Sequence, residues 1–352
     1  LLVSEISNIY KKNGKTRKNH NLVFLPSLDA AERFNRRLDA IGIIRSDGRP
    51  ILGLDARDLL EILLEVDERA FLVPAHIWTP WFSLLGSKSG FDSLEECFED
   101  LSGHIFAAET GLSSDPAMNR LVSSLDRLTL ISNSDAHSAS KLAREANIFH
   151  CTPGYSAIRA ALEDPQTNQF GGTIEFYPEE GKYHLDGHRK CGVRLTPAET
   201  RTLNGICPVC GRSLTVGVYN RIQALADRPP EGIPSWQPPF ESLVPLPEVL
   251  SELLQVGAAT KTVARAYVLA LESLGNELHI LRDVPPEQLD RTGIPLLGEA
   301  IRRMRVGELD IQAGYDGDYG HIQIFSDAEK HVLLGQRELF PGAPKDPTAN
   351  DG

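Results

Sequence analysis

The chain has 352 residues, of which 41% are hydrophobic and 24% charged, and its formal net charge at pH 7 is −12. This length and composition are sufficient for a buried core in more than one folding unit. The negative charge argues against indiscriminate binding to polyanions, although local basic surfaces are still compatible with it. No apolar run approaches the ~20 residues that span a bilayer, and the first residues lack the pattern of a signal peptide. We therefore predict a soluble, cytoplasmic protein with no membrane partner.

Short apolar strands alternate with helical stretches from residue 1 to about residue 185. Strand patterns cover 1–10, 21–27, 51–55, 70–78, 104–111 and 128–137, and helical patterns cover 28–42, 56–67, 93–101, 118–127 and 155–164. Alternation of this kind predicts parallel βα units, arranged as a barrel or as a doubly wound sheet. We favour the barrel because polar residues gather where the strands end.

Carboxylates and imidazoles recur along these strands and at their ends. Asp135 and His137 follow a buried strand pattern, and residues two apart on a strand point to the same face, as a metal-binding pair requires. In the alternative interpretation, Asp135 caps a helix that starts near Ala139 and His137 is an incidental surface residue. The other candidates in equivalent places are Glu5, His20, His76 and Glu109. A rim that concentrates such groups needs cations to offset it, so we predict divalent metals, either Zn, Mn or Mg.

A basic segment lies near the amino terminus, at residues 11–18. Its five cations surround Gly14 between two strand patterns, which predicts the tip of a β-hairpin. The tip is either a solvated turn or a finger that contacts phosphates. The cations are Lys11, Lys12, Lys15, Arg17 and Lys18.

A strong zinc pattern follows residue 185. Cys207 and Cys210 form a C-x2-C-G turn that lets two thiolates bind one ion, and Cys191 supplies a third ligand. The fourth ligand is His188, with His184 as the competitor. Four protein ligands leave no position for substrate, so we expect this zinc to be structural. An odd number of cysteines with three close together suits a reducing compartment.

The composition changes along the chain give the expected domain boundaries. We predict the barrel at 1–185, the zinc-binding module at 186–226, a helical domain at 227–330 and a tail at 331–352. The helical domain opens with a proline-rich linker and contains helical patterns at 249–256, 262–275 and 295–307.

Several quoted segments carry a resemblance to a known family. The run PAHIWTPWFSLLGSKSGFDSLEECF at residues 74–98 is the most specific, and LVSEISNIY, NSDAHS, CPVCG and YDGDYG extend it over nearly the whole chain. These segments resemble the polymerase and histidinol phosphatase (PHP) superfamily and, within it, the endonuclease Q family of DNA repair enzymes. The resemblance implies an α/β fold, a partial PHP-type distorted (β/α)7 barrel with a small zinc-binding module and a C-terminal helical domain. It implies hydrolysis of the DNA phosphodiester 5′ of deaminated bases (uracil, hypoxanthine, xanthine) or abasic sites.

The resemblance also implies roles for particular residues. Two or three divalent metals would be held by Glu5, His20, His76, Asp135 and His137, and catalysis would rest on Asp135, His137, His76 and Glu109. Glu109 would ligate a metal or orient a ligand. The family opens with an H-x-H strand that this sequence lacks, so we expect an N-terminally truncated chain with impaired activity.

Two further segments are interpreted through the same resemblance. The loop after His76 would stack on bases or displace them, although its aromatics are equally compatible with core packing. Its candidates are Trp78, Trp81, Phe82 and Lys88, which would act beside the basic hairpin. Near the end, Gln336, Leu339 and Phe340 have the Q-x-x-L-F spacing of peptides that bind the bacterial sliding clamp. This predicts a clamp partner and a bacterial, nucleoid-associated location.

Two other functions compete with this interpretation. One is a PHP phosphoesterase that acts on a small phosphate monoester, which would not need the zinc module or the helical domain. The other is a non-catalytic DNA-binding or helicase-associated protein. The sequence contains no complete G-x4-G-K-[ST] phosphate loop, which argues against a nucleotide-driven motor.

Overall fold

The computed structural model describes residues 1–45 and 48–338, and within them the chain forms two compact units. The first comprises Leu1–Leu243 with Gln312–His321, and the second comprises Val244–Ile311 with the chain from Ile322 onward. The first unit thus includes the segment 186–226, and the second begins at Val244 instead of residue 227. No helix in the described part of the chain combines the length and apolar character needed to cross a bilayer.

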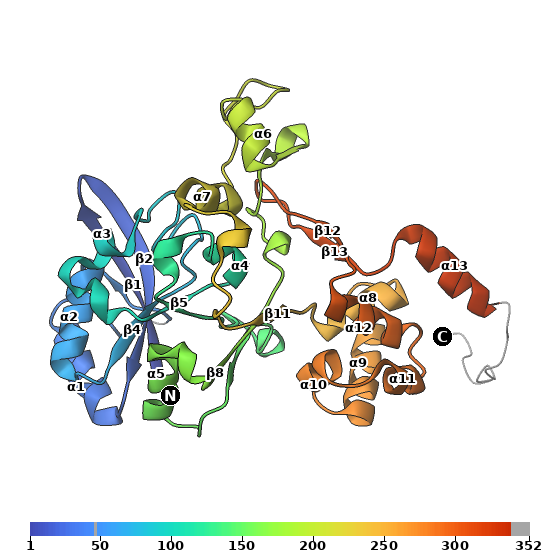
Figure 1. The fold of residues 1–352 in the computed structure, drawn as a ribbon, viewed down its shortest axis with the longest axis horizontal. Coiled ribbons are helices and arrows are strands. Elements are labelled where there is room, and N and C mark those ends of the chain that lie inside the picture. Colours follow the sequence, from blue (N-terminus) through green and yellow to red (C-terminus); the bar gives the residue numbers. More distant parts are fainter. Residues whose placement is uncertain (46–47, 339–352) are drawn as a thin grey trace. The chain divides into compact units, whose positions relative to one another are not determined.

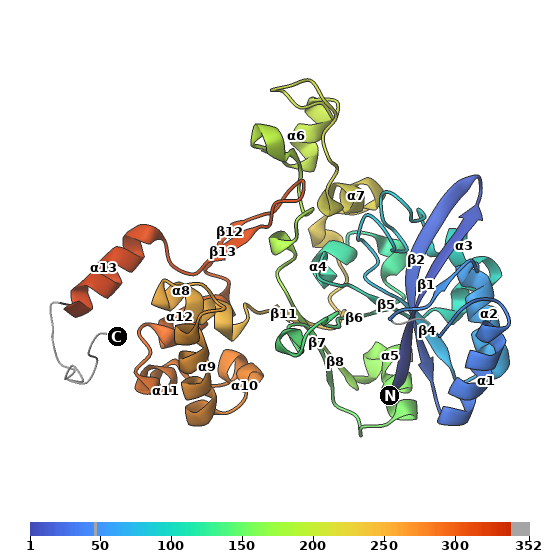
Figure 2. The same ribbon diagram turned by 180° about the vertical axis from the view of Figure 1, so that it is seen from behind.

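A four-stranded sheet opens the first unit, with the order β3-β1-β2-β4. The antiparallel β1 and β2 turn at Asn13 and Gly14, whose φ angles of 53° and 73° suit a two-residue hairpin turn. The predicted basic hairpin is therefore confirmed. Three helices, α1, α2 and α3, lie together beside this sheet (Figures 1 and 2). The elements are β1 (Leu2–Lys12), β2 (Lys15–Leu25), β3 (Ile51–Leu52), β4 (Phe71–Pro74), α1 (Leu28–Asp39), α2 (Ala56–Val66) and α3 (Leu94–Phe98).

The core of the first unit forms because the apolar faces of these helices meet the sheet. Phe34 of α1 and Leu59 and Leu63 of α2 are buried in one cluster with Ile6 and Val23 of the hairpin. Burial of a large aliphatic or aromatic side chain contributes ~1.5–3 kcal/mol. This cluster fixes β1 and β2, which carry two of the candidate metal ligands.

The remaining strands of the first unit pair in three smaller sheets, one of which consists of β9 (Asp186–His188) and β10 (Val193–Leu195). β5 and β6 are parallel, and β8 lies between β7 and β11. The proline-rich segment predicted as a linker therefore contributes a strand, since β11 pairs with β8. The described strands form five separate sheets, and a closed barrel is not shown. The elements are β5 (Ala107–Glu109), β6 (Thr129–Ile131), β7 (Ala146–Phe149), β8 (Phe170–Glu175), β11 (Phe240–Ser242) and α5 (Tyr155–Glu163).

The helix predicted over 118–127 is wrong. The chain forms only α4 (Pro116–Asn119), passes through an extended Val122 and makes a short 3-10 turn at Ser123–Leu125. The buried Arg120 explains the break, because its guanidinium donates to the carbonyls of Leu125 and Leu128. These bonds stabilise a compact loop in place of a continuous helix.

The second unit is mainly helical. Its core includes Leu250, Val263, Ile280, Ala300 and Ile301, which are buried on facing helices. The three helices predicted here from the sequence are confirmed as α8, α9 and α12. The elements are α8 (Leu246–Leu254), α9 (Lys261–Leu274), α10 (Glu277–Arg282), α11 (Pro286–Leu289), α12 (Leu297–Val306), β12 (Asp310–Gln312), β13 (His321–Gln323) and α13 (Asp327–Glu338).

Candidate functional site

Three of the predicted metal ligands meet in one cluster. Glu5 lies on β1, His20 on β2 and His76 just after β4, and their ligand atoms all lie within 4.8 Å of one another. His20 Nδ1 is 3.0 Å from Glu5 Oε1 and 3.1 Å from His76 Nε2. The hairpin register produces this meeting, because His20 is opposite Ser7 and is therefore the diagonal neighbour of Glu5.

The charges in the cluster depend on one another. Burial opposes ionisation of Glu5, but the imidazoles of His20 and His76 outweigh it and hold the pKa of its carboxyl well below its usual range. Burial lowers the pKa of His20. Burial also opposes a charged His76, but Glu5 and Glu109 raise its pKa above the usual value. The cluster therefore holds an ionised carboxylate between two imidazoles.

This donor set fits a divalent metal ion. Glu5 Oε1 is buried and lies 3.0 Å from His20 Nδ1 and 3.6 Å from His76 Nε2. One carboxylate with two imidazoles is a set that Zn, Mn and related ions accept. The buried carboxylate oxygen that faces two ring nitrogens is thus the observation that favours a cation here.

His76 is held in place by the backbone and by a buried carboxylate. Its N–H donates to Glu109 Oε2 at 2.8 Å, and Asn133 Nδ2 donates to Glu109 Oε1 at 2.8 Å. Burial raises the pKa of Glu109. Gly111 has a φ of +62°, and a Cβ there would overlap the Cβ of His76 and lie 2.8 Å from its Cα. Only glycine fits this position without displacing the candidate ligand.

Arg49 is a member of the cluster that the sequence did not indicate. Its Nη1 lies 2.7 Å from His20 Nδ1, and its Nε lies 3.0 Å from Glu5 Oε2. Arg49 belongs to no predicted motif, so only the fold could reveal it. The guanidinium supplies positive charge to the carboxylate that a metal ion would also contact.

The structure does not bring Asp135 and His137 into this three-residue cluster. β6 ends at Ile131, and Asp135 lies in a loop with a φ of 43°, so the alternation of a strand does not apply to the pair. Their side chains are 42% and 77% exposed. Asp135 does lie close enough for its charge to favour protonated His76. The alternative helix cap is wrong as well, because the 3-10 turn after them begins behind Ser138.

Glu175 is a further buried carboxylate beside the site that the sequence analysis missed. It ends β8, is fully buried, and accepts hydrogen bonds from Thr110 Oγ1 at 3.1 Å and Ser132 Oγ at 3.0 Å. Burial raises its pKa to about 7. The rule that polar groups gather at strand ends would have found it, had the strand at 170–175 been recognised.

The four residues predicted to hold structural zinc lie together. His188 ends β9 (Asp186–His188), Cys191 lies before β10 (Val193–Leu195), and Cys207 and Cys210 lie between α6 (Pro197–Thr202) and α7 (Val218–Leu225). Their ligand atoms are all within 4.8 Å of one another, and Cys210 Sγ is 3.4 Å from His188 Nδ1. Gly211 N–H donates to the Cys207 carbonyl at 2.9 Å, which closes the turn between the two thiols.

The chemistry of these four side chains suits zinc. Burial opposes ionisation of Cys207, but the backbone N–H groups of Cys210 and Val209 lower its thiol pKa to about 7. A thiolate is the form that binds the metal. The competitor His184 lies outside the cluster, where its buried ring stacks on Tyr219 with the centroids 5.7 Å apart.

Several residues predicted to bind DNA have structural roles instead. Lys12 pairs with Asp55 at 3.1 Å and with Glu99 at 2.7 Å. Arg17 is buried, donates to the Gly90 carbonyl and covers the Phe91 ring. Trp78 is fully buried, and its Nε1 donates to Asn119 Oδ1 at 2.7 Å, so it cannot stack on a base. These three residues are therefore engaged in contacts within the protein, which do not support their predicted DNA contacts; those contacts stay predictions.

Other predicted DNA contacts remain accessible. Lys11, Lys15 and Lys88 are exposed, and Trp81 is 53% exposed. Lys18 Nζ lies 5.5 Å from the centroid of the Trp81 ring. The partly buried ring of Phe82 packs on His20, with the centroids 4.9 Å apart. Lys18, Trp81 and Phe82 thus place a cation and two aromatic rings beside the candidate ligand His20.

A cavity of about 280 Å³ adjoins this surface. Its lining includes Thr79, Trp81, Lys182, Tyr183 and His184. Thr79 Oγ1 lies 3.3 Å from Nδ1 of the candidate ligand His76, which places one wall of the cavity beside the metal cluster. His184 Nδ1 is buried and has no partner among the described residues.

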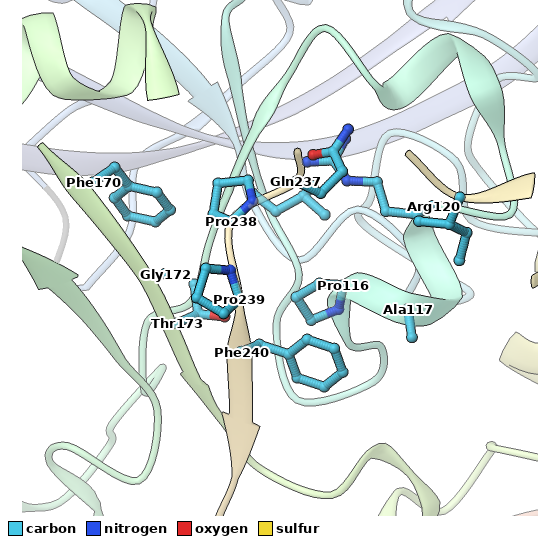
Figure 3. Close-up of a pocket in the computed structure, with 12 residues that line it drawn as sticks. Pro116, Ala117, Arg120, Phe170, Gly172, Thr173, Gln237, Pro238, Pro239 and Phe240 are labelled. Carbon is cyan, nitrogen blue, oxygen red and sulfur yellow. The ribbon is translucent and has the colours of Figure 1, made fainter. Parts of the chain in front are cut away.

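A second cavity, of about 240 Å³, contains none of the candidate residues. Figure 3 shows Pro238, Pro239 and Phe240 on one side of it and Arg120 on the other. Its lining is mainly apolar and includes no carboxylate, imidazole or thiol. This cavity lacks the groups that hydrolytic chemistry requires.

The predicted clamp-binding peptide is not described by the structure. Leu339 and Phe340 lie outside the described residues, and the side chain of Gln336 is not described either. The sliding-clamp partner gains no support from the comparisons that follow.

Comparisons with known proteins cover most of the chain. Residues 245–308 match the domain family described as the MJ0043 C-terminal domain. The chain is 32% identical over 253 residues to the uncharacterized protein MJ0043 of Methanocaldococcus jannaschii, a match that covers 70% of this chain but only 31% of the length of MJ0043. It is 30% identical over 309 residues to the uncharacterized protein YqxK of Bacillus subtilis, covering 86% of this chain and 73% of YqxK.

Two crystal structures share the fold. One is the lesion-specific endonuclease PfuEndoQ of Pyrococcus furiosus, with a TM-score of 0.79, 30% identity, and coverage of 91% of this chain and 77% of that chain. The other is endonuclease Q in complex with a 27-mer duplex substrate that has an abasic lesion at the active site. Its TM-score is 0.78 at 30% identity, and the match covers 93% of this chain and 80% of that chain. The α/β fold thus defines a protein that shares its architecture with lesion-specific DNA endonucleases. The chain belongs to the endonuclease Q family.

Proposed function

We propose that this chain is a metal-dependent DNA endonuclease that hydrolyses the phosphodiester 5′ of deaminated bases or abasic sites. The observation that carries the proposal is the cluster of Glu5, His20 and His76. It lies in a chain whose fold matches solved lesion-specific endonucleases over about nine-tenths of its length. The deaminated bases in question are uracil, hypoxanthine and xanthine.

The metal ligands of this proposal come from the cluster and from the adjacent loop. Glu5, His20 and His76 would hold divalent Zn, Mn or Mg, with Asp135 and His137 as further ligands for two or three ions in total. The action of Asp135 on the charge of His76 supports its inclusion. Bound divalent ions supply a water nucleophile at neutral pH and neutralise charge on the phosphate.

Other residues of the chain position the ligands. The Glu109 carboxylate fixes the backbone of His76 by accepting a hydrogen bond from the His76 N–H, and Asn133 fixes Glu109 by donating to the same carboxylate. These buried bonds orient the imidazole, and loss of such outer contacts typically reduces metal affinity or activity ~10- to 100-fold. Arg49 provides a cation beside Glu5 that attracts a phosphate to the same place.

DNA recognition would use the surface beside the metal cluster. A damaged base must leave the stack before the enzyme can inspect it, and unpairing is cheapest where pairing is already weak. The cavity lined by Trp81 and Tyr183 has a volume of about 280 Å³ and would receive the base. Lys11, Lys15, Lys18 and Lys88 would contact phosphates, and Trp81 and Phe82 would stack on neighbouring bases.

The Cys/His cluster would hold one structural zinc. His188, Cys191, Cys207 and Cys210 provide four ligands, which fill a tetrahedral site and leave no position for substrate. The zinc would fix the segment that follows His184, a residue of the cavity wall. Its expected contribution is to folding of this segment and not to hydrolysis.

A nicking assay tests the proposed function. Labelled duplexes that carry one deoxyuridine, deoxyinosine or abasic site are incubated with Mn²⁺, Mg²⁺ or Zn²⁺ beside an undamaged duplex. We expect lesion-dependent nicking that is lost in His76→Gln and retained in His104→Gln, an exposed histidine outside the cluster. Hydrolysis of a small phosphate monoester without any nicking would support the phosphoesterase alternative. Nicking that survives His76→Gln would contradict the proposed site.

A further inference from the structure

The loop Gln312–His321 returns to the first unit and is fixed there by backbone hydrogen bonds. Gly314 is bonded on both sides, because its N–H donates to the Glu179 carbonyl at 2.8 Å and its carbonyl accepts from Leu185 N–H at 2.9 Å. Gly317 N–H donates to the Lys182 carbonyl at 2.9 Å. We call residues 312–321 the return loop. Its contacts make a rigid attachment beside the cavity that we propose for the base.

Side chains and close packing complete the attachment. Asp316 accepts from the N–H of Arg189 at 2.7 Å and from Thr215 Oγ1 at 2.5 Å. A Cβ at Gly187 would collide with the ring of Tyr315, so glycine is required for this contact. The YDGDYG sequence at 315–320 is thus accounted for in part by docking. Docking does not explain its last aromatic residue.

Tyr319 projects from the return loop into solvent. It is 70% exposed, and Lys182 Nζ lies 4.7 Å from the centroid of its ring. Tyr183, 42% exposed, lies next in the chain to Lys182. Exposed aromatic rings with a cation on one face are suited to stacking on nucleic-acid bases. Lys182 and Tyr183 also line the proposed base cavity, so this surface continues from it.

The return loop also gathers arginines. Arg189 Nη1 is 3.5 Å from the Gly317 carbonyl, and Arg194 Nη1 donates to the Ala313 carbonyl at 3.2 Å. Both are exposed, and within residues 1–45 and 48–338 the hydrogen-bond partner of each guanidinium is a carbonyl. Asp316 is engaged by its two donors, and Asp318 is the exposed acid of the loop. Lys182, Arg189 and Arg194 thus give this surface three exposed cations able to contact phosphates, beside the carboxylates of Asp316 and Asp318.

We propose that Lys182, Tyr183, Arg189, Arg194 and Tyr319 form a second DNA-binding surface, which holds the strand beside the lesion while the damaged base occupies the adjacent cavity. The cations contact phosphates, and Tyr319 stacks on an unpaired base. The proposal rests on the proposed function for the identity of the ligand, but it concerns binding and not hydrolysis. Its residues therefore act on affinity and not on the chemical step.

The test is fluorescence anisotropy with a labelled duplex containing an abasic site, in buffer without divalent metal so that no strand is cut. We expect Tyr319→Ala to weaken binding about tenfold, which corresponds to loss of one stacked base, and Tyr319→Trp to bind like the unmodified chain. The double variant Lys182→Ala, Arg189→Ala should reduce the slope of log affinity against log salt by about 1.8, since each lost phosphate contact removes about 0.9.

Matched controls separate this surface from general electrostatics. The variant Arg36→Ala, Arg37→Ala removes two exposed cations from α1 and should leave the salt slope unchanged. Equal effects of the two double variants, or normal binding by Tyr319→Ala, would overturn the proposal. If the unmodified chain binds DNA and Tyr319→Ala binds less, the surface stands even where no nicking occurs. If the unmodified chain nicks lesions and Tyr319→Ala has normal affinity, the surface fails and the proposed function stands.

Discussion

Substitution of Gly111 by alanine should displace His76 and disable the candidate metal centre. The new Cβ would lie 2.8 Å from His76 Cα, whereas carbon atoms normally approach to ~3.5–4.0 Å, so one of the two must move by about 1 Å. A misplacement of ~1 Å at a reacting centre costs about 100-fold in rate. The left-handed φ of +62° adds ~1–2 kcal/mol of backbone strain for alanine.

A second glycine provides the control for that strain. Gly293 has a φ of +77°, and a Cβ added there would meet no atom within 4 Å, so Gly293→Ala carries the backbone cost without the collision. Thermal unfolding should show a similar loss of stability from backbone strain in both variants, with an additional loss in Gly111→Ala from the collision with His76. Nicking and divalent-metal affinity should fall in Gly111→Ala alone. If both variants nick equally well, the reasoning from the Gly111 contact to His76 is refuted.

Three further predictions concern stability, packing and zinc. Burial raises the pKa of Asp115 from 3.8 to about 6, so the folded state binds this proton more tightly than the unfolded state does. The free energy of unfolding should therefore fall by at most ~3 kcal/mol as the pH rises from 4 to 7. Asp115→Asn, which cannot ionise, should raise the melting temperature at pH 8 but not at pH 4. Trp78→Phe should lower the free energy of unfolding by ~1–3 kcal/mol, because the buried Asn119 Oδ1 loses its donor. DNA affinity should be unchanged, and a loss of affinity would indicate a DNA-binding role for Trp78. Chelation should release one zinc fewer per chain from Cys207→Ser than from the unmodified chain; equal release from both would exclude this thiol as a ligand.

Local sequence signals predicted the features that depend on short stretches of chain. The Asn13–Gly14 turn with flanking strand patterns gave the hairpin, and the C-x2-C spacing gave Cys207 and Cys210. Glu5 and His20 were found because polar residues interrupt apolar strands, and the hairpin register then brings them together. Apolar periodicity predicted α9 and α12 because each of these helices buries one face in the core of the second unit.

Contacts between distant segments explain what the sequence did not show. Arg49 joins Glu5 and His20 from a loop without a motif, and Gly111 is required only because His76 passes close to it. The same-face argument for Asp135 failed because β6 ends four residues earlier, which the apolar pattern does not reveal. Trp78 has an aromatic ring of the kind that stacks on bases, but it is buried, and its Nε1 donates a hydrogen bond to the buried Asn119.

Mapping the cut site tests the central claim most directly. A duplex with a single deoxyuridine, labelled at either end of the damaged strand, is incubated with the chain and divalent metal, and the products are sized beside an undamaged duplex. The account predicts one cut immediately 5′ of the deoxyuridine, no cut in the undamaged duplex, and loss of cutting in Glu5→Gln. Cutting of both duplexes alike, or no cutting by a chain that binds divalent metal at Glu5, would contradict it.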